Sequence, residues 1–136
     1  MIEIVTALVR DERGRVLVVR KRGTESFMQP GGKREPGESD LDALARELRE
    51  ELGCSIVAGS AKLLGVFVAP AANEPGQQVR AAVYAARLAG EVICRAEIED
   101  HIWIDPREPR DTPLAPLTRD TILPLALALD DRGQAL

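Results

Sequence analysis

The most constraining feature of the sequence is a glycine- and proline-rich stretch, residues 29–37, that leads directly into an amphipathic segment. Neither helix nor strand tolerates so dense a run of these two residue types, so we expect a loop there. Ser39 then suits a helix N-cap, acidic side chains follow in the first turn, and Gly53 suits the position just beyond the last turn. The sequence therefore predicts a helix between Ser39 and Gly53, entered through a glycine-rich loop.

The predicted helix carries two distinct faces. At about 100° per residue, its aliphatic side chains gather on one arc, which we expect to face the core. These residues are Leu41, Leu44, Ala45, Leu48 and Leu52. Glu47, Glu50 and Glu51 stand at i, i+3 and i+4 and share a second arc, with Glu51 bordering the apolar one. Like charges at such spacings destabilise a helix by roughly 0.2–0.5 kcal/mol each. A divalent cation that prefers hard oxygen ligands would relieve this repulsion. A solvated acidic face is the simpler alternative, and spacing alone does not exclude it.

The residues before and within this helix match a longer pattern. From Gly32 the sequence runs GKREPGESDLDALARELREELGC, which fits G-x5-E-x7-R-E-U-x-E-E-x-G-U, where U is aliphatic. Cys54 at the last position is a small departure that a buried thiol tolerates. This pattern is the signature of the Nudix hydrolase family, which the chain thereby resembles. The preceding FMQPGG also resembles the family's entry into the signature.

The resemblance implies an α/β fold of the α+β kind, an α/β/α sandwich with a mixed sheet. The length of 136 residues predicts a single domain over 1–136. Alternation and turn signals predict strands at 2–9 and 16–19, joined as a hairpin, and further strands at 63–69, 79–88 and 101–105. A last helix is expected within 118–129, with Pro124 in its first turn or kinking it.

The resemblance also assigns roles to residues of the signature. It implies that Glu47, Glu50 and Glu51 bind Mg²⁺, with Mn²⁺ as an alternative, and that a backbone carbonyl of Gly32 or its neighbour Gly31 joins them. Glu47 and Glu50 then count among the catalytic residues as well as the metal ligands. Arg46 would orient Glu47 through an ion pair, whereas Glu38 at the junction of loop and helix would be structural.

The implied reaction is attack of water on phosphorus in a pyrophosphate bond, aided by divalent cations and by a carboxylate that takes the water's proton. Two positions for this base stay open. One is Glu47, within the signature. The other is Glu97, six residues before Trp103, in a spacing that resembles relatives with a late metal ligand. Glu99 and Asp100 compete with Glu97, and a plain polar turn is an equal alternative.

The expected substrate is a small nucleotide, either a nucleoside triphosphate or a nucleoside diphosphate linked to another group. Arg20 and Lys33 are candidates for holding its phosphates, and Phe27 for contacting its base. Only four aromatic residues are present, so aliphatic side chains and backbone groups should dominate base recognition. We look for specificity in the loop around Asn73 and in the proline-rich segment 106–116, because loops on a rigid scaffold usually carry it.

Composition argues against other partners. The net charge of −4 and the scarcity of aromatic rings disfavour a nucleic-acid polymer, and with it the alternative of an RNA 5′-end pyrophosphohydrolase. A non-catalytic binding module is a further alternative, which the complete set of signature glutamates disfavours. The two cysteines favour reduced thiols, and the absence of a signal-like start or a long apolar run predicts a cytoplasmic protein without membrane contact. Family resemblance alone suggests a homodimer.

Overall fold

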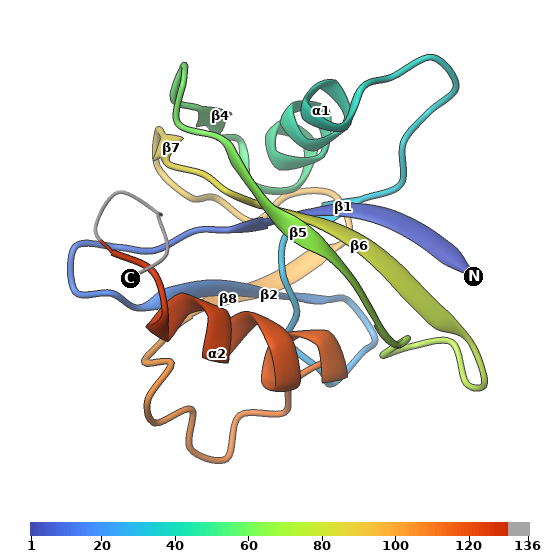
Figure 1. The fold of residues 1–136 in the computed structure, drawn as a ribbon, viewed down its shortest axis with the longest axis vertical. Helices are drawn as coiled ribbons and strands as arrows, with labels where there is room; N and C mark the ends of the chain where they lie inside the picture. Colours follow the sequence, from blue (N-terminus) through green and yellow to red (C-terminus); the bar gives the residue numbers. More distant parts are fainter. Residues whose placement is uncertain (131–136) are drawn as a thin grey trace.

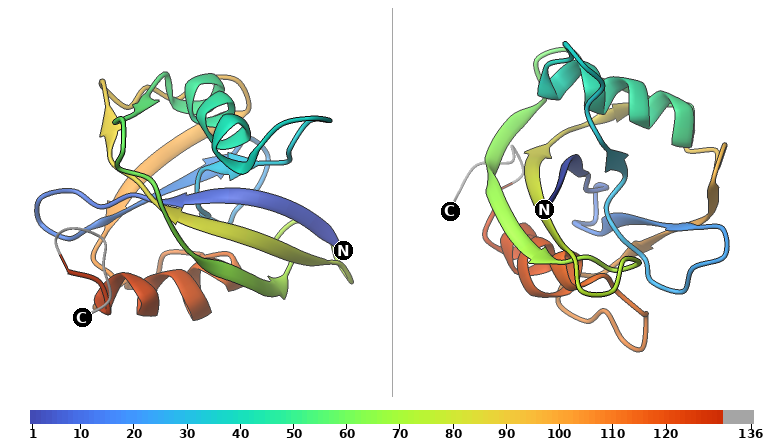
Figure 2. Two further views of the ribbon diagram at one scale, coloured as in Figure 1. Left: turned by 45° about the horizontal axis from the view of Figure 1, so that its top comes forward. Right: turned by 90° about the vertical axis from the view of Figure 1, so that its right-hand side faces the viewer.

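A computed structural model describes residues 1–130 of the chain. Its helices lie on opposite sides of the strands (Figure 1). On one side is α1 (Asp40–Leu52); on the other, a π-helical turn (Thr118–Ile122) runs into α2 (Leu123–Leu127). The end-on view in Figure 2 shows the strands enclosed between them. The expected α+β sandwich is therefore present.

The strands pair in a mixed pattern. The largest sheet has the order β3-β1-β6-β5. Its members are β1 (Ile2–Leu8), β3 (Gly31–Gly32), β5 (Lys62–Pro70) and β6 (Gln78–Ala85). In this sheet β1 and β6 run parallel, while the other neighbours are antiparallel. Two antiparallel ladders complete the layer, one between β2 (Val16–Lys21) and β8 (Ile98–Ile104), the other between β4 (Ser55–Ile56) and β7 (Leu88–Ala89).

Each side of the strand layer has its own apolar core. Successive side chains of a strand point to opposite faces, so β1 sends Val5 toward α1 and Leu8 toward α2. In the same way β2 sends Leu17 toward α1 and Val18 toward α2, and all four side chains are buried. Strands covered on both faces carry continuous apolar runs rather than a polar alternation, as β2 does over residues 16–19.

The predicted hairpin between the first two strands exists only at its tip. Asp11 N–H donates to the carbonyl of Arg15 at 3.0 Å, and Leu17 N–H donates to that of Val9 at 2.9 Å. Beyond that point the strands separate, β1 into the four-stranded sheet and β2 into its ladder with β8. A turn signal identifies the bend but not the later partners of each strand, because those partners lie far away in sequence.

The helix that carries the signature begins and ends as expected. The Ser39 hydroxyl accepts a hydrogen bond from Asp42 N–H at 3.1 Å, and Gly53 ends the helix with a left-handed φ of 69°. Leu44, Leu48 and Leu52 are fully buried. The expectation that Leu41 faces the core was wrong, since 43% of it is exposed. Leu41 lies in the first turn of α1, where the buried residue is Ala43.

Other element boundaries shift by a few residues. The glycine-rich stretch was expected to be loop throughout, yet Gly31 and Gly32 pair with Thr6 and Val5 of β1 as the short strand β3. The strand predicted at 101–105 begins earlier, at Ile98. Pro124 lies in the first turn of α2, as its missing N–H allows. Within residues 1–130, no helix is long and apolar enough to span a membrane.

Candidate active site

The helix α1 presents its three signature glutamates at different depths. Glu51 is 3% exposed, while the side chain of Glu47 is 16% exposed and that of Glu50 is 56% exposed. This gradient follows from the helical wheel, because Glu51 stands next to the apolar arc and Glu50 lies farthest from it. The exposure of the three side chains thus increases from Glu51 through Glu47 to Glu50 along one side of α1.

Arg46 ties the loop to the helix. Its guanidinium donates two hydrogen bonds of 2.8 Å to the carboxylate of Glu38 and one of 2.9 Å to that of Glu47. It also donates to the Lys33 carbonyl at 3.0 Å and lies 3.6 Å from Glu50. The Arg46 hydrogen bonds lower the pKa of Glu38 to about 2, so this carboxylate is charged under all ordinary conditions. A planar fork of donors suits such multiple carboxylate contacts better than an ammonium group would.

Glu51 is a buried carboxyl group with one direct hydrogen-bond donor in the loop. The N–H of Gly31 donates to its Oε1 at 3.2 Å. Burial, together with the nearby charges of Glu47 and Glu97, raises the pKa of Glu51 to about 8, against the opposing effects of the Gly31 hydrogen bond and the Lys21 charge. The charged form of Glu51 therefore lacks sufficient compensation from the surrounding protein.

The two glycines of β3 let the backbone approach both strand and helix closely. A Cβ on Gly31 would lie 2.1 Å from the Val5 carbonyl oxygen, and the φ of 146° at Gly31 disfavours any L side chain. A Cβ on Gly32 would lie 2.6 Å from Cδ of Glu47. Glycine at these positions therefore opens the space in front of the glutamates.

This arrangement fits a divalent cation of the hard class. The donors are carboxylate and backbone carbonyl oxygens, which Mg²⁺ and Mn²⁺ prefer. The uncompensated Glu51 and the side-chain-free surface at Gly32 point the same way. Over the described residues, no three acidic, cysteine or histidine side chains already converge on one point. Glu47 is turned toward Arg46 and Glu51 toward Gly31, so binding requires these side chains to rotate.

A cavity of about 300 Å³ opens beside Glu47 and the two glycines. Two cationic side chains, Lys21 and Lys33, line it, and so does Glu97. Lys21 Nζ lies 3.5 Å from Glu97 Oε1, and the Glu97 side chain is 61% exposed. The later-loop acid expected from the sequence thus lies at the same cavity as the signature residues, whereas Glu99 pairs with Arg22 at 3.1 Å.

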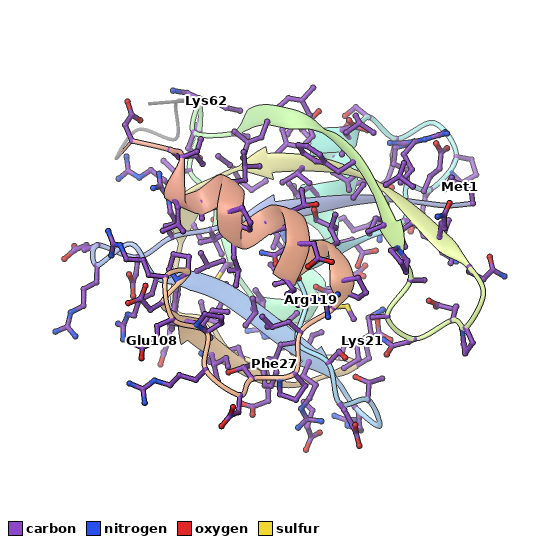
Figure 3. All side chains as sticks on the ribbon, turned by 60° about the horizontal axis from the view of Figure 1, so that its bottom comes forward. Met1, Lys21, Phe27, Lys62, Glu108 and Arg119 are labelled. Atoms are coloured by element: carbon purple, nitrogen blue, oxygen red, sulfur yellow. The ribbon has the colours of Figure 1, made fainter. Side chains whose placement is uncertain are left out.

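Two candidate substrate residues lie elsewhere. Arg20 donates to the Thr24 carbonyl at 2.9 Å, and its guanidinium lies 5.9 Å from the ring centroid of Phe27. Phe27 is 9% exposed and belongs to the core on the α2 side. Neither residue lines the cavity, whereas Lys33 does. Figure 3 marks Lys21 at the end of β2 and Phe27 in the segment that follows it.

Several cavity residues were not singled out as site residues from the sequence. They are Thr6, Gln29 and Thr118 on the floor, and the aliphatic side chains Ile2, Ile4 and Leu117 around them. Asn73 and Glu74 line it from the loop between β5 and β6, one of the two segments in which the sequence predicts specificity. Of the proline-rich segment 106–116, Ala115 alone reaches the cavity. A polar residue between apolar neighbours in a buried strand, as Thr6 is, was the signal available in advance.

Comparison with known proteins agrees with this site. The model of the NUDIX domain family matches residues 2–125. CTP pyrophosphohydrolase of Escherichia coli is 32% identical over 122 residues, covering 85% of this chain and 84% of the relative. The 8-oxo-dGTP diphosphatase of Haemophilus influenzae is 37% identical over 71 residues, or 49% and 51% of the two chains. A crystal structure of a MutT NUDIX hydrolase from Burkholderia pseudomallei aligns with a TM-score of 0.75 at 29% identity, over 90% of this chain and 95% of that one.

These matches show that the chain belongs to the Nudix hydrolase family. The signature expected from the sequence, the sandwich fold and the family match agree with one another. The chain is therefore a Nudix pyrophosphohydrolase, of a family that generally uses divalent metals.

Proposed function

We propose that this enzyme hydrolyses a pyrophosphate bond in a small nucleotide, with Mg²⁺ or Mn²⁺ held by Glu47, Glu50 and Glu51 and by a backbone carbonyl of Gly31 or Gly32. The observation that carries the proposal is that Glu47 and the close-approach glycines line one cavity with two lysines, while buried Glu51 accepts a hydrogen bond from the N–H of Gly31. A bound divalent cation supplies charge neutralisation of phosphate oxygens and a lower pKa for the attacking water.

The residues around the cations have separate roles in positioning a carboxylate and in binding the substrate. Arg46 holds the carboxylate of Glu47 in place through their 2.9 Å hydrogen bond. Lys21 and Lys33, both at the cavity, bind phosphate oxygens of the substrate. The substrate class is a nucleoside triphosphate or a nucleoside diphosphate derivative, as the names of the relatives in Escherichia coli and Haemophilus influenzae suggest.

The test measures product release from a panel of nucleotides in the presence of Mg²⁺. It compares wild type with the variants Glu51→Gln and Glu50→Gln. The panel includes the four ribonucleoside triphosphates, 8-oxo-dGTP, ADP-ribose and a 5′-triphosphorylated RNA. Glu12→Gln, at an exposed glutamate of the β1–β2 turn, is the matched control. We expect a loss of about 10²–10³-fold in kcat for Glu51→Gln and little change for Glu12→Gln. Equal rates in all variants would show that the carboxylates are not the site.

Two carboxylates compete as the base that accepts the water's proton. Glu97 is at the cavity, exposed, and paired only loosely with Lys21 at 3.5 Å. Glu47 is held by Arg46. We favour Glu97, because a base needs a free lone pair within reach of the water. A Glu97→Gln variant should lose about 10²-fold or more in kcat. An unchanged kcat in that variant assigns the base to Glu47.

Three broader expectations stay proposals. The chain acts as one domain over 1–136, of which the last six residues lie outside the described part. It works in the cytoplasm on small molecules, and it forms a homodimer. Light scattering coupled to size-exclusion chromatography measures the mass directly and decides the last of these.

A further inference from the structure

The floor of the cavity carries a polar atom without a partner. Thr6 is 3% exposed, and within residues 1–130 its Oγ1 is the buried side-chain oxygen or nitrogen that makes no hydrogen bond. Buried hydroxyl groups are nearly always satisfied, because an unpaired one loses its hydration without a hydrogen bond in return. An orphaned hydroxyl that also lines a cavity is therefore a candidate contact for a ligand.

The other buried polar side chains of the cavity, Gln29 and Thr118, hydrogen-bond each other. Thr118 Oγ1 donates to Gln29 Oε1 at 2.9 Å, and Gln29 Nε2 donates to the carbonyls of Ala7 at 3.3 Å and Leu17 at 3.5 Å. Both Gln29 and Thr118 are buried and line the same cavity. The satisfied pair fixes the shape of the floor and leaves the Thr6 hydroxyl available to whatever fills the space.

The walls near Thr6 indicate which part of a nucleotide fits there. Strand alternation places Thr6 on the same face of β1 as Ile4 and Leu8, the face toward α2. The lining from this side is aliphatic, with Ile4, Val79 and Leu117. Such walls suit the flat faces of a nucleobase and not a phosphate group, and the cationic side chains of the cavity are available to phosphates.

We infer that the Thr6 hydroxyl is a specificity-determining group that hydrogen-bonds the polar edge of the substrate's nucleobase. A hydroxyl both donates and accepts, so it can meet a carbonyl or an N–H of the base. In the free protein the hydroxyl is unpaired, and the base supplies its hydrogen-bond partner on entering the cavity. This inference rests on the proposed function and adds to it a residue outside the signature that reads the base.

Three variants separate this role from a structural one. Thr6→Val removes the hydroxyl at nearly the same volume, and Thr6→Ser keeps it. Thr118→Val is the matched control, because it removes a buried hydroxyl that has a partner. For ligand-free protein, we expect the unfolding midpoint of Thr6→Val to stay level or rise by roughly 2–5 °C, since an unsatisfied group is lost. The unfolding midpoint of Thr118→Val should fall by a similar amount, because the side-chain carbonyl of Gln29 loses its hydrogen-bond donor.

Binding is measured by titrating nucleoside 5′-monophosphates and, separately, ribose 5-phosphate into metal-free protein. Wild type should bind its best monophosphate more tightly than ribose 5-phosphate. Thr6→Val should bind that monophosphate about tenfold more weakly and ribose 5-phosphate with unchanged affinity. Thr6→Ser should bind both with affinities near those of wild type. In turnover, Thr6→Val should raise KM for the preferred triphosphate and reduce selectivity among the four bases, with kcat nearly constant.

Three results would overturn the inference. If Thr6→Val unfolds several degrees lower and binds monophosphates normally, the hydroxyl holds a structural water. If ribose 5-phosphate weakens as much as the monophosphates, the hydroxyl contacts the sugar-phosphate part. If wild type binds ribose 5-phosphate as well as any monophosphate, the cavity does not take the base. None of these outcomes touches the proposed function, which instead fails if wild type hydrolyses no nucleotide on the panel.

Discussion

Replacing Glu51 by glutamine should make the metal-free protein more stable, by an amount that grows with pH. In the folded state burial raises the pKa of this carboxyl to about 8, against an ordinary value of 4.5 in the unfolded chain. Between these two values the folded protein binds one more proton than the unfolded chain, so stability falls as pH rises. Glutamine keeps the shape and an acceptor for Gly31 N–H, yet carries no charge.

The size of the effect follows from the two pKa values. Each unit of difference corresponds to about 1.4 kcal/mol, so the penalty from ionising Glu51 reaches on the order of 4 kcal/mol at pH 8 and is under about 1 kcal/mol at pH 5. Subtracting the wild-type value from that of the variant at each pH removes the contributions that the two proteins share. The penalty is a large fraction of the 5–15 kcal/mol typical of a folded domain.

Urea unfolding in a chelating buffer at pH 5, 6, 7 and 8 measures this difference. We expect Glu51→Gln to gain roughly 3 kcal/mol over wild type between pH 5 and pH 8, with equal m-values. The exposed-site variant Glu12→Gln should track wild type throughout. A difference between Glu51→Gln and wild type that does not change with pH would refute the reasoning, because Glu51 would then ionise as easily in the folded protein as in solution.

Three further changes test the contacts around the cavity. Gly32→Ala places a Cβ 2.6 Å from Glu47 Cδ, so kcat should fall about 10²-fold by steady-state kinetics while the chain stays folded by circular dichroism. Arg46→Lys loses the fork that holds two carboxylates at once, and we expect kcat to fall about tenfold with KM unchanged. Lys21→Met removes the ammonium group that lies 3.5 Å from Glu97 and should raise KM about tenfold. Lys21→Arg keeps a positive charge there and should raise KM much less.

Much of the site was predictable because its information is local. The cap at Ser39, the left-handed end at Gly53 and the depth order of the glutamates all follow from spacing within one helix. The ion pair of Arg46 with Glu47 was expected from the family resemblance, and the structure contains it at 2.9 Å. These features depend on residues within about one or two helical turns.

Features that depend on distant pairing were beyond the sequence. The separation of β1 from β2 depends on partners near residues 79–85 and 98–104, which no turn signal specifies. Leu41 is exposed although the helical wheel places it on the apolar arc, because burial depends on what packs against the helix and not on the wheel alone. Gln29 and Thr118, 89 residues apart, hydrogen-bond each other, while the Thr6 hydroxyl has no partner. Only the folded chain shows which polar groups are left over.

Divalent-cation binding tests the central claim most directly. Mn²⁺ titrated into wild type, Glu51→Gln and Glu12→Gln, with free Mn²⁺ followed by electron paramagnetic resonance, reports affinity without any assumption about substrate. We predict that wild type and Glu12→Gln bind alike and that Glu51→Gln binds at least about tenfold more weakly. Equal affinity in all three proteins would contradict the account, because the buried glutamate of α1 would then hold no metal.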